Sequence, residues 1–515
     1  MNIKTFKFID ENQTGIVVNF NNVDKNPVTV SLFLDNEKIE TISTNKSHYL
    51  FNIDKSGSYH VSISFIDSNK SICHLIDNPV SYHLSQQNIK QETKPEIKLK
   101  TINHKIDGIN NYFLEIKFKI NNTHLVMDTL STELINFKLT LTKPNIELPT
   151  QQYEYLNLYG EDNFDHLVEI AQKLEQLDYV NYCCICPDTT DYLPPKLPLN
   201  NQIIKEDDIL SDEITPDFSE LQKYLDAPMG MNVRESWEKN INGSQAVVRH
   251  MDFGVYRNHE DLKDANLIVV SSRSETQNCN HGTASTGCVI ATKNEFGVTG
   301  VAHGCQFYFY DTDDLDRLTD DTQPGDIVSF DLQFHIDNKL LPIISVRNWW
   351  ERIKIMVDKG ATVLLAAGNG GLDLSQFGIM DDFGDNGCML VGACDHLTGK
   401  RTSFSNYNQK NSLINSWGDW SVTTTGYGTL QKHPGNDRNY TDSYSGTSSA
   451  TPLCSGALAL IQGYAKQHQI ILSAWGMREL IRKSTYMEGV CDGIGYRPNV
   501  NQLLEEIDKL AQITE

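Results

Sequence analysis

The chain has 515 residues, of which 39% are hydrophobic and 22% are charged, and this composition predicts a globular protein with about two to three domains. Its formal net charge of -23 argues against a nucleic-acid partner, because such proteins need basic side chains to neutralise phosphates. No stretch reaches about 18 uninterrupted apolar residues, so the sequence predicts no membrane span.

The N-terminus and the cysteines bear on the compartment. Residues 1–10 lack the apolar stretch and small-residue cleavage site of a secretory signal. The 11 cysteines are an odd number in mostly apolar contexts, which favours buried free thiols over disulfides. We therefore expect a cytoplasmic protein, or one exported without a recognisable N-terminal signal peptide.

The first two regions of the chain differ in pattern. Residues 1–95 contain stretches of alternating apolar and polar residues separated by Asn, Asp and Gly, which predicts a β-sandwich-like accessory domain. In 96–187, alternating stretches precede an amphipathic helix at 165–176 and a strand at 180–185. This second region is predicted to be a small α+β domain.

Residues 188–218 are rich in proline and contain the acidic run 206–208, so we expect an exposed linker that is open to proteolysis. From 219 to 515, short apolar strand candidates alternate with helical stretches such as 346–359. This alternation is typical of a doubly wound, mostly parallel α/β sheet with helices on both faces.

Four residues of catalytic type lie at the ends of these predicted elements. Asp252 and Asn369 each follow a predicted strand, and His281 and Ser448 each open a predicted helix. The carboxyl ends of the strands in such a sheet meet at one edge. Free backbone N–H groups at a helix N-terminus suit a serine nucleophile whose attack produces an oxyanion. Taken singly, each residue is equally typical of a turn or a cap.

The sequence around these residues contains several further motifs in a fixed order. They include Asp252-Phe-Gly-Val255, His281-Gly-Thr283, Ala366-Ala-Gly-Asn369 and Gly446-Thr-Ser-Ser-Ala-Thr-Pro452. With these motifs, the catalytic part resembles the subtilisin-like serine proteases, the subtilase or peptidase S8 family. The resemblance implies a subtilisin-like fold for 219–515 and the hydrolysis of peptide bonds in protein or peptide substrates.

The resemblance also implies a role for each residue. Ser448 would attack the peptide carbonyl, His281 would take and return its proton, and Asp252 would orient the imidazole. Asn369 and the Ser448 backbone N–H would form the oxyanion hole, and no cofactor is required. The substrate chain would be bound by Ser329, Phe330, Asp331, Ala366 and Gly368.

Two stretches depart from the family pattern. Arg249 and His250 stand where the family usually has apolar residues, and Asp331 stands where it usually has glycine. Between Asp311 and Asp331 the chain has eight aspartates: Asp311, Asp313, Asp314, Asp316, Asp320, Asp321, Asp326 and Asp331. If this stretch borders the cleft, its carboxylates would favour basic residues on the N-terminal side of the cut. The alternative is an ordinary solvated acidic loop.

The resemblance carries two further expectations. Asp261 and Asn294 match positions of the family's calcium site, whose oxygen ligands suit Ca²⁺, and the alternative is an empty turn. Residues 96–187 resemble, more loosely, the propeptide that covers the active site of such enzymes. The chain would then be a zymogen inhibited by its own N-terminal region, and the alternative is a plain accessory domain.

The sequence therefore predicts a serine endopeptidase. The alternative is a catalytically silent subtilase-fold binding protein that uses its N-terminal domain for recognition, although a silent scaffold has no physical need for all four residues. The serine-carboxyl peptidases share a Gly-Thr-Ser motif but need an acidic base, so His281 excludes them.

Overall fold

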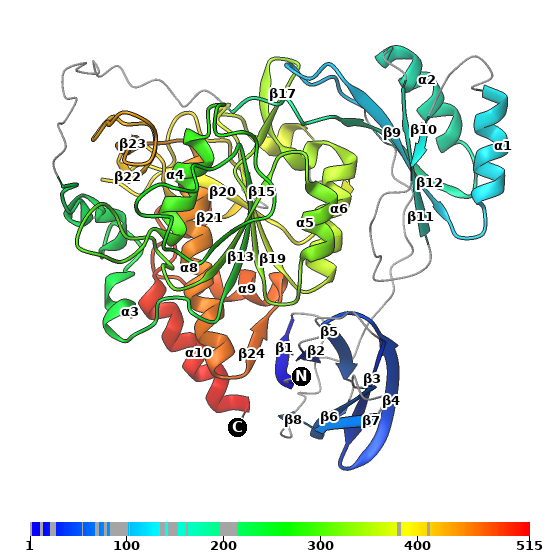
Figure 1. Ribbon diagram of the computed structural model, residues 1–515, viewed down its shortest axis with the longest axis horizontal. Coiled ribbons are helices and arrows are strands. Elements are labelled where there is room, and N and C mark those ends of the chain that lie inside the picture. Colours follow the sequence, from blue (N-terminus) through cyan, green and yellow to red (C-terminus); the bar gives the residue numbers. More distant parts are fainter. Residues whose placement is uncertain are drawn as a thin grey trace.

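In the computed structural model, two smaller units are attached to a central α/β unit (Figure 1). The structure describes residues 3–10, 14–20, 27–53, 55–66, 72–76, 80–82, 101, 103–133, 140–142, 153–160, 163–194, 214–377, 383–408 and 412–514. Within these ranges, no helix combines the length and the apolarity needed to cross a bilayer. The part of the predicted linker from 195 to 213 lies outside the described residues.

A seven-stranded sheet forms the centre of the α/β unit, in the order β14-β15-β13-β16-β19-β20-β21. Its strands are β13 (Val247–Asp252), β14 (Leu267–Val269), β15 (Gln306–Asp311), β16 (Ile327–Phe330), β19 (Thr362–Ala366), β20 (Met389–Cys394) and β21 (Ser412–Trp417). All of its pairings are parallel. Strands β16, β19 and β20 are buried along their whole length, as expected when helices cover both faces.

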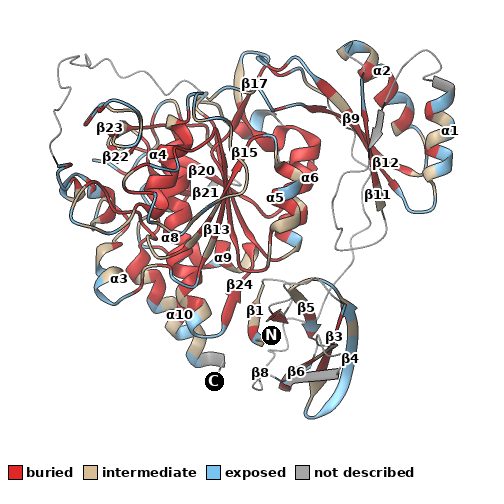
Figure 2. Ribbon diagram, in the orientation of Figure 1, coloured by how far each residue is buried: buried red, intermediate tan, exposed pale blue. Residues whose placement is uncertain are grey.

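Helices pack on the two faces of this sheet, and the buried residues concentrate in the strands and in the helices beside them (Figure 2). One apolar core joins the sheet to α4 and α8, and the other joins it to α5 and α6. The helices are α3 (Arg234–Glu238), α4 (Asn280–Ile290), α5 (Leu315–Asp321), α6 (Arg347–Asp358), α8 (Thr447–Gln467), α9 (Ala474–Ile481) and α10 (Val500–Thr514). The prediction of a doubly wound α/β fold is confirmed.

Two small antiparallel pairs complete this unit. They are β17 (Gln333–Ile336) with β18 (Lys339–Pro342), and β22 (Val422–Thr425) with β23 (Tyr440–Tyr444). The first pair is a hairpin that turns through Asp337 and Asn338, both in the left-handed region with φ of 49° and 61°. Asp and Asn tolerate this region better than other residues with a side chain, so they are suited to a two-residue turn.

The α+β unit is an antiparallel sheet, in the order β10-β11-β9-β12, with two helices. Its elements are β9 (Tyr112–Lys119), α1 (Thr123–Glu133), β10 (Thr140–Thr142), β11 (Tyr153–Tyr159), α2 (Phe164–Glu175) and β12 (Val180–Pro187). Helix α2 lies at the predicted position, and the side chain of Asn163 caps its N-terminus.

A buried ionic network attaches this unit to α6 of the central unit. Arg352 forms an ion pair with Glu115, and Glu351 forms one with Lys117. Tyr182 Oη donates to Glu115 at 2.6 Å, and all of these charged groups are buried. Removing one partner of such a pair leaves a buried charge without compensation, at about 3–5 kcal/mol. In addition to the apolar packing, the ion pairs therefore fix which residues of the two units face each other.

The N-terminal unit is entirely β in its described residues. Its strands are β1 (Ile3–Ile9), β2 (Thr14–Phe20), β3 (Val28–Leu34), β4 (Glu37–Thr44), β5 (His48–Ile53), β6 (Gly57–Ile66), β7 (Ile72–Ile76) and β8 (Val80–Tyr82). They form two sheets around a common apolar core. Strand β1 also pairs in parallel with β24 (Ile470–Leu472), so strand addition joins this unit to the central one.

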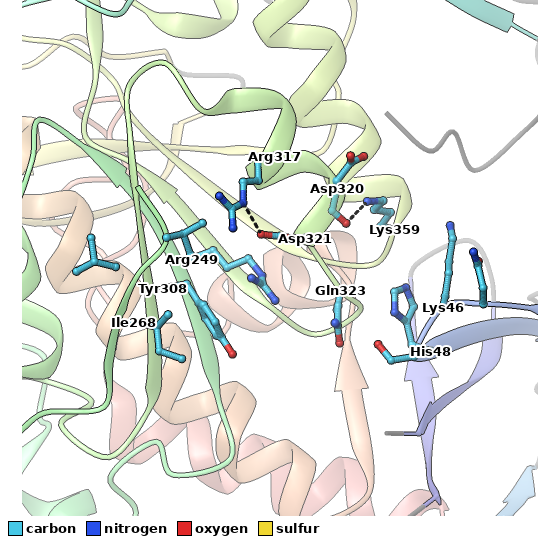
Figure 3. Close-up of a pocket in the computed structure, with 14 residues that line it drawn as sticks. Lys46, His48, Arg249, Ile268, Tyr308, Arg317, Asp320, Asp321, Gln323 and Lys359 are labelled. Carbon is cyan, nitrogen blue, oxygen red and sulfur yellow. Dashed lines mark hydrogen bonds and ion pairs between the residues drawn. The ribbon is translucent and has the colours of Figure 1, made fainter. Parts of the chain in front are cut away.

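A polar cavity of about 690 Å³ lies between the N-terminal unit and the central sheet (Figure 3). Lys46 and His48 line it from one side, and Arg249 and Tyr308 from the other. Arg249 Nε donates to Asp326 Oδ2 at 2.7 Å, and the guanidinium lies 4.6 Å from the centroid of the Tyr308 ring. These contacts explain how β13 accommodates an arginine.

Candidate active site

Asp252 and His281 are in direct contact at the carboxyl edge of the sheet. Asp252 is the last residue of β13, and His281 lies in the first turn of α4. His281 Nδ1 lies 2.6 Å from Asp252 Oδ1, and both side chains are buried. Gly282 permits this approach, because a Cβ at that position would lie only 2.1 Å from the carbonyl oxygen of Gly254.

Two imidazoles beside Asp252 keep its carboxyl group ionised. Burial by itself opposes the charged form, but His281 and His250 beside the carboxylate hold the pKa of Asp252 well below its usual range. The Phe253 N–H also donates to Asp252 Oδ1 at 2.6 Å. A carboxylate on Nδ1 leaves Nε2 of His281 as the basic nitrogen, and Nε2 has no hydrogen-bond partner among the described residues.

Ser448 lies in the first turn of α8, the long helix that packs against α4. Gly446 precedes this helix with a φ of 89°, which favours glycine. The side chain of Ser448 is 3% exposed, so the hydroxyl lies at the floor of the site rather than at the surface. At this helix end the Thr447 N–H donates to Asn369 and the Ser449 N–H to the carbonyl of Gly446, so the Ser448 N–H between them is the donor best placed for an anion.

Asn369 follows β19, and neighbouring residues fix its orientation. Its Oδ1 accepts from the Thr447 N–H at 2.9 Å and from Thr447 Oγ1 at 3.2 Å. The amide nitrogen Nδ2 would lie 3.1 Å from a Cβ at Gly446, beside the turn that leads to Ser448. The free end of the side chain is therefore an N–H donor next to Ser448, which is what an oxyanion hole requires.

Of the four residues predicted to be catalytic, the structure places Asp252 in contact with His281, and Asn369 in contact with Thr447, which adjoins Ser448. It treats the predicted substrate-binding residues differently. Ser329, Phe330 and Asp331 have fully buried side chains. Ser329 contacts His250, Phe330 packs against Trp349, and Asp331 accepts a hydrogen bond from Ser285. Their side chains do not line an open groove, so substrate contacts there are left to the backbone. The other two predicted residues, Ala366 and Gly368, flank the turn that carries Asn369.

Residues 188–194 follow β12 and are mostly exposed, as the sequence predicted for the linker, but Thr189 and Tyr192 make contacts close to this site. Thr189 Oγ1 donates to the carbonyl of Thr312 at 2.7 Å, and Tyr192 Oη donates to the carbonyl of Gln333 at 2.9 Å. The Tyr192 ring lies 6.0 Å from the Phe253 ring, which lies 5.6 Å from the His281 ring. No motif marks Tyr192 in the sequence.

Most of the eight aspartates between 311 and 331 serve the fold. Their partners are Arg273 for Asp311, Arg352 for Asp316, Tyr310 for Asp321, Arg249 for Asp326 and Ser285 for Asp331. Asp313, by contrast, is exposed, and Asp314 is half-buried and accepts from Ser271. Internal arginines neutralise Asp311, Asp316 and Asp326, so only part of this stretch is left to face solvent or a substrate.

Asp261 is buried in a ring of hydrogen-bond donors. Asn294 Nδ2 donates to its Oδ1 at 2.9 Å, while the Val298 N–H and Tyr440 Oη donate to its Oδ2 at 2.8 and 3.0 Å. The oxygen of Asn294 is held by the Phe296 N–H at 3.0 Å, so this side chain presents its amide nitrogen to Asp261. Calcium needs oxygen lone pairs at these positions, so the arrangement does not fit the predicted Ca²⁺ site.

Three other groups of side chains within the described residues are compact enough to hold a metal ion. They are Glu115, Cys184 and Cys186; His250, Asp252 and Asp331; and Asp395, His396 and Asp419. In the first group the carboxylate already pairs with Arg352, and in the second it belongs to the Asp252–His281 contact. These partners oppose a cation in both groups.

Comparisons with known proteins agree with this geometry. The model of the Subtilase family, Peptidase_S8, matches residues 243–502. Over 243 residues the chain is 29% identical to a thermostable alkaline protease of Halalkalibacterium halodurans, covering 45% of this chain and 61% of that protein. Over 279 residues it is 25% identical to a calcium-dependent protease of a Nostoc species, covering 45% and 40%. The matches thus span less than two thirds of these relatives.

Among solved structures, the chain is similar to a serine protease of Aeromonas sobria. The TM-score is 0.43 at 19% identity, and the likeness covers 60% of this chain and 71% of the other.

Proposed function

Because the chain belongs to the subtilase family, we propose that it is a serine endopeptidase that acts through Asp252, His281 and Ser448. The observation that carries the proposal is the 2.6 Å contact between His281 Nδ1 and Asp252 Oδ1, which leaves Nε2 without a partner among the described residues on α4, the helix that packs against α8 and its Ser448. A serine hydroxyl is a weak nucleophile at neutral pH, and this base would activate it.

The reaction would proceed in two halves. Ser448 Oγ attacks the peptide carbonyl while His281 Nε2 accepts its proton, and the tetrahedral oxyanion is bound by the Asn369 Nδ2–H and the Ser448 backbone N–H. His281 then donates the proton to the leaving amine. A water molecule, activated by the same imidazole, hydrolyses the acyl-enzyme and frees Ser448. Asp252 stabilises the imidazolium in both halves.

The N-terminal units would restrain this activity. The contacts of residues 188–194 with Thr312, Gln333 and Phe253 support a segment that lies in the approach to His281. The ionic network on α6 supports a propeptide-like domain that holds this segment in place. The chain would therefore be a self-inhibited precursor that cleavage in the linker activates.

Asp313 and Asp314 would contribute to selectivity. They follow Thr312, the residue that contacts Thr189, so they border the path of residues 188–194. Carboxylates beside that path favour basic residues on the N-terminal side of the cut. A peptide library without such enrichment would refute this preference.

Calcium dependence and cellular compartment are two further parts of the proposal. Although some relatives are calcium-dependent proteases by name, the donors around Asp261 support activity without calcium at this position. Ten of the cysteines are free thiols, and nine of these are buried, the exposed one being Cys491. They support a reducing compartment such as the cytoplasm, or export that needs no N-terminal signal peptide.

Labelling with a fluorophosphonate probe tests the proposed activity. Wild type should react, and Ser448→Ala should not, because the probe bonds to an activated serine. Ser445→Ala is the matched control, since its hydroxyl is in the same loop and has no hydrogen-bond partner among the described residues. If neither the intact nor the linker-cleaved chain is labelled, the chain is instead a silent binding protein.

Labelling of the intact chain also tests self-inhibition. Tyr192→Ala removes the ring contacts with Phe253 and Phe334 and should increase the labelling rate of the uncleaved chain. Leu193→Ala changes the adjacent side chain, which is 75% exposed, and serves as the control. An uncleaved wild type that reacts as fast as the linker-cleaved form would refute self-inhibition.

A further inference from the structure

Two residues that depart from the family pattern, His250 and Asp331, meet beside the carboxylate of Asp252. His250 Nε2 lies 3.2 Å from Asp252 Oδ2 and 4.0 Å from Asp331 Oδ2. All three side chains are fully buried. Asp252 therefore contacts an imidazole through each oxygen, His281 through Oδ1 and His250 through Oδ2.

The surroundings of His250 fix its ring and its tautomer. The ring centroid lies 5.6 Å from that of Phe307 and 6.0 Å from that of Phe309, on the neighbouring strand β15. His250 Nδ1 lies 2.9 Å from Ser329 Oγ on β16, the neighbour on the other side. Because the Asp252 carboxylate only accepts hydrogen bonds, the ring proton belongs on Nε2, and Nδ1 accepts from the serine.

Asp331 is arranged to be uncharged. Burial, together with the charge of Asp252, raises the pKa of Asp331 well above its usual range. Ser285 Oγ donates to its Oδ2 at 2.6 Å, and Oδ1 has no partner among the described residues. The other titratable groups that face this cluster, besides His281, have raised pKa values and are neutral: Tyr427, Tyr444, Cys279, Cys288 and Cys454. His250 therefore faces a single negative charge, that of Asp252.

We propose that His250 is a positioning residue for the reaction described above: it holds the second oxygen of Asp252 and thereby sets the proton affinity of His281. This inference rests on the proposed peptidase activity. With a donor on Oδ2, the charge of Asp252 is shared between two imidazoles and the carboxylate plane is fixed. Without that donor, the charge concentrates on Oδ1, His281 becomes more basic, and the carboxylate is free to rotate away from it.

Two substitutions separate this role from simple packing. His250→Phe fills a similar volume without a donor and should lower kcat about 10- to 100-fold, the range expected for a lost hydrogen bond to a charged group. The acid limb of the pH profile of kcat/KM, which reports His281, should move up by about half a unit to one unit. His250→Gln, whose amide can donate to the same oxygen, should restore most of the rate and return the limb toward its wild-type position.

The measurements use the full-length chain with its linker opened by limited proteolysis, and thermal unfolding confirms that each variant is folded. His259→Gln is the matched control: His259 is also fully buried, but its Nε2 contacts the carbonyl of Asn439 rather than Asp252. This control should leave the limb in place. A folded His250→Phe variant with an unmoved limb would overturn the inference.

A second readout does not depend on activity. Nitrogen NMR of histidine-labelled Ser448→Ala protein should show a ring proton of His250 on Nε2, the nitrogen that faces Asp252, with Nδ1 accepting from Ser329. A proton on Nδ1 instead would overturn the inference even if the enzyme were inactive. The wild type could show the predicted tautomer and yet neither hydrolyse peptides nor react with the fluorophosphonate. This result would refute the proposed function but not the hydrogen bond between His250 and Asp252.

Discussion

Asp252 and Asp261 are nine positions apart in the sequence, and both are fully buried, yet their surroundings are opposite. Asp252 contacts the imidazoles of His281 and His250, and its pKa is held well below the usual range. Asp261 contacts only uncharged donors, from Val298, Asn294 and Tyr440, and burial raises its pKa to about 7. The same residue type therefore has its pKa lowered in one place and raised toward neutrality in the other.

The difference shows what decides the charge of a buried acid. Desolvation acts on both carboxyls in the same direction, and several neutral donors do not overcome it at Asp261. The positive charge that an adjacent imidazole carries once it is protonated does overcome desolvation at Asp252. The first environment suits catalysis, because the charge of Asp252 is available whenever His281 accepts a proton. The second suits structure.

The largest expected effect distinguishes the two sites by activity. Asp252→Asn keeps the size of the side chain but removes the charge that fixes the His281 tautomer, and kcat should fall about ten-thousand-fold, as in other Ser-His-Asp triads. The measurement is kcat on a peptide substrate after linker cleavage. Asp261→Asn is the matched control and should lose far less, since no partner of Asp261 touches His281. Equal losses in the two variants would contradict the comparison.

The next effect concerns stability and pH. The folded pKa of Asp261, about 7, lies above the unfolded value of about 4, so the folded state binds more protons between them. The contribution of Asp261 to stability is therefore present at low pH and is lost as the pH rises toward 7. Relative to wild type, the free energy of unfolding of Asp261→Asn should rise by up to about 1.4 kcal/mol per pH unit in this window.

Urea denaturation at about pH 5 and about pH 7 measures this slope. Both proteins also carry Ser448→Ala, which prevents autolysis. The sign reverses at Asp252, whose lowered pKa gives a contribution that is present above about pH 4 and is lost as the pH falls further. A wild-type advantage over Asp261→Asn that grows with pH would show that Asp261 is ionised in the folded state.

A smaller effect is expected from Tyr440→Phe. The change removes the hydroxyl whose proton is shared between Asp261 Oδ2 and Glu260 Oε1, each 3.0 Å away, and should cost about 1–3 kcal/mol. The cost should be larger above pH 7 than below it, because the ionised carboxylate depends more on the donor. Tyr464→Phe is the control: its hydroxyl bonds to Asp508, which is 44% exposed, so water replaces the lost contact. Equal costs in the two variants would argue against the donor ring.

The smallest effect is expected from metal removal. Because protein donors already occupy both oxygens of Asp261, adding EGTA should change Tm by less than about 1 °C, and so should adding calcium. A cation bound at about 100 times its Kd would stabilise the fold by about 2.7 kcal/mol. A Tm that rises by several degrees with calcium would contradict the fit of these donors and restore the site predicted from the sequence.

The sequence predicted the parts of the fold that depend on local pattern. Strand and helix alternation indicated the doubly wound sheet, and the amphipathic stretch at 165–176 indicated α2. It did not predict that β1 would pair with β24, because the pairing joins segments more than 400 positions apart and neither strand carries a signal for it. Nor did it predict that residues 188–194 would pack beside Phe253, since a proline-rich composition indicates exposure, whereas the contacts of Thr189 and Tyr192 are tertiary.

The sequence by itself determined which side chains could do chemistry: it placed Asp252, His281, Asn369 and Ser448 at element ends that a parallel sheet brings to one edge. Only the tertiary structure decided what each buried group contacts. Tyr440, which donates to Asp261, is 179 positions away, and Ser329, which orients His250, is 79 positions away. Since the pKa of a buried group depends on its neighbours as well as on its own type, those distant contacts decided which aspartate has its pKa lowered and which has it raised.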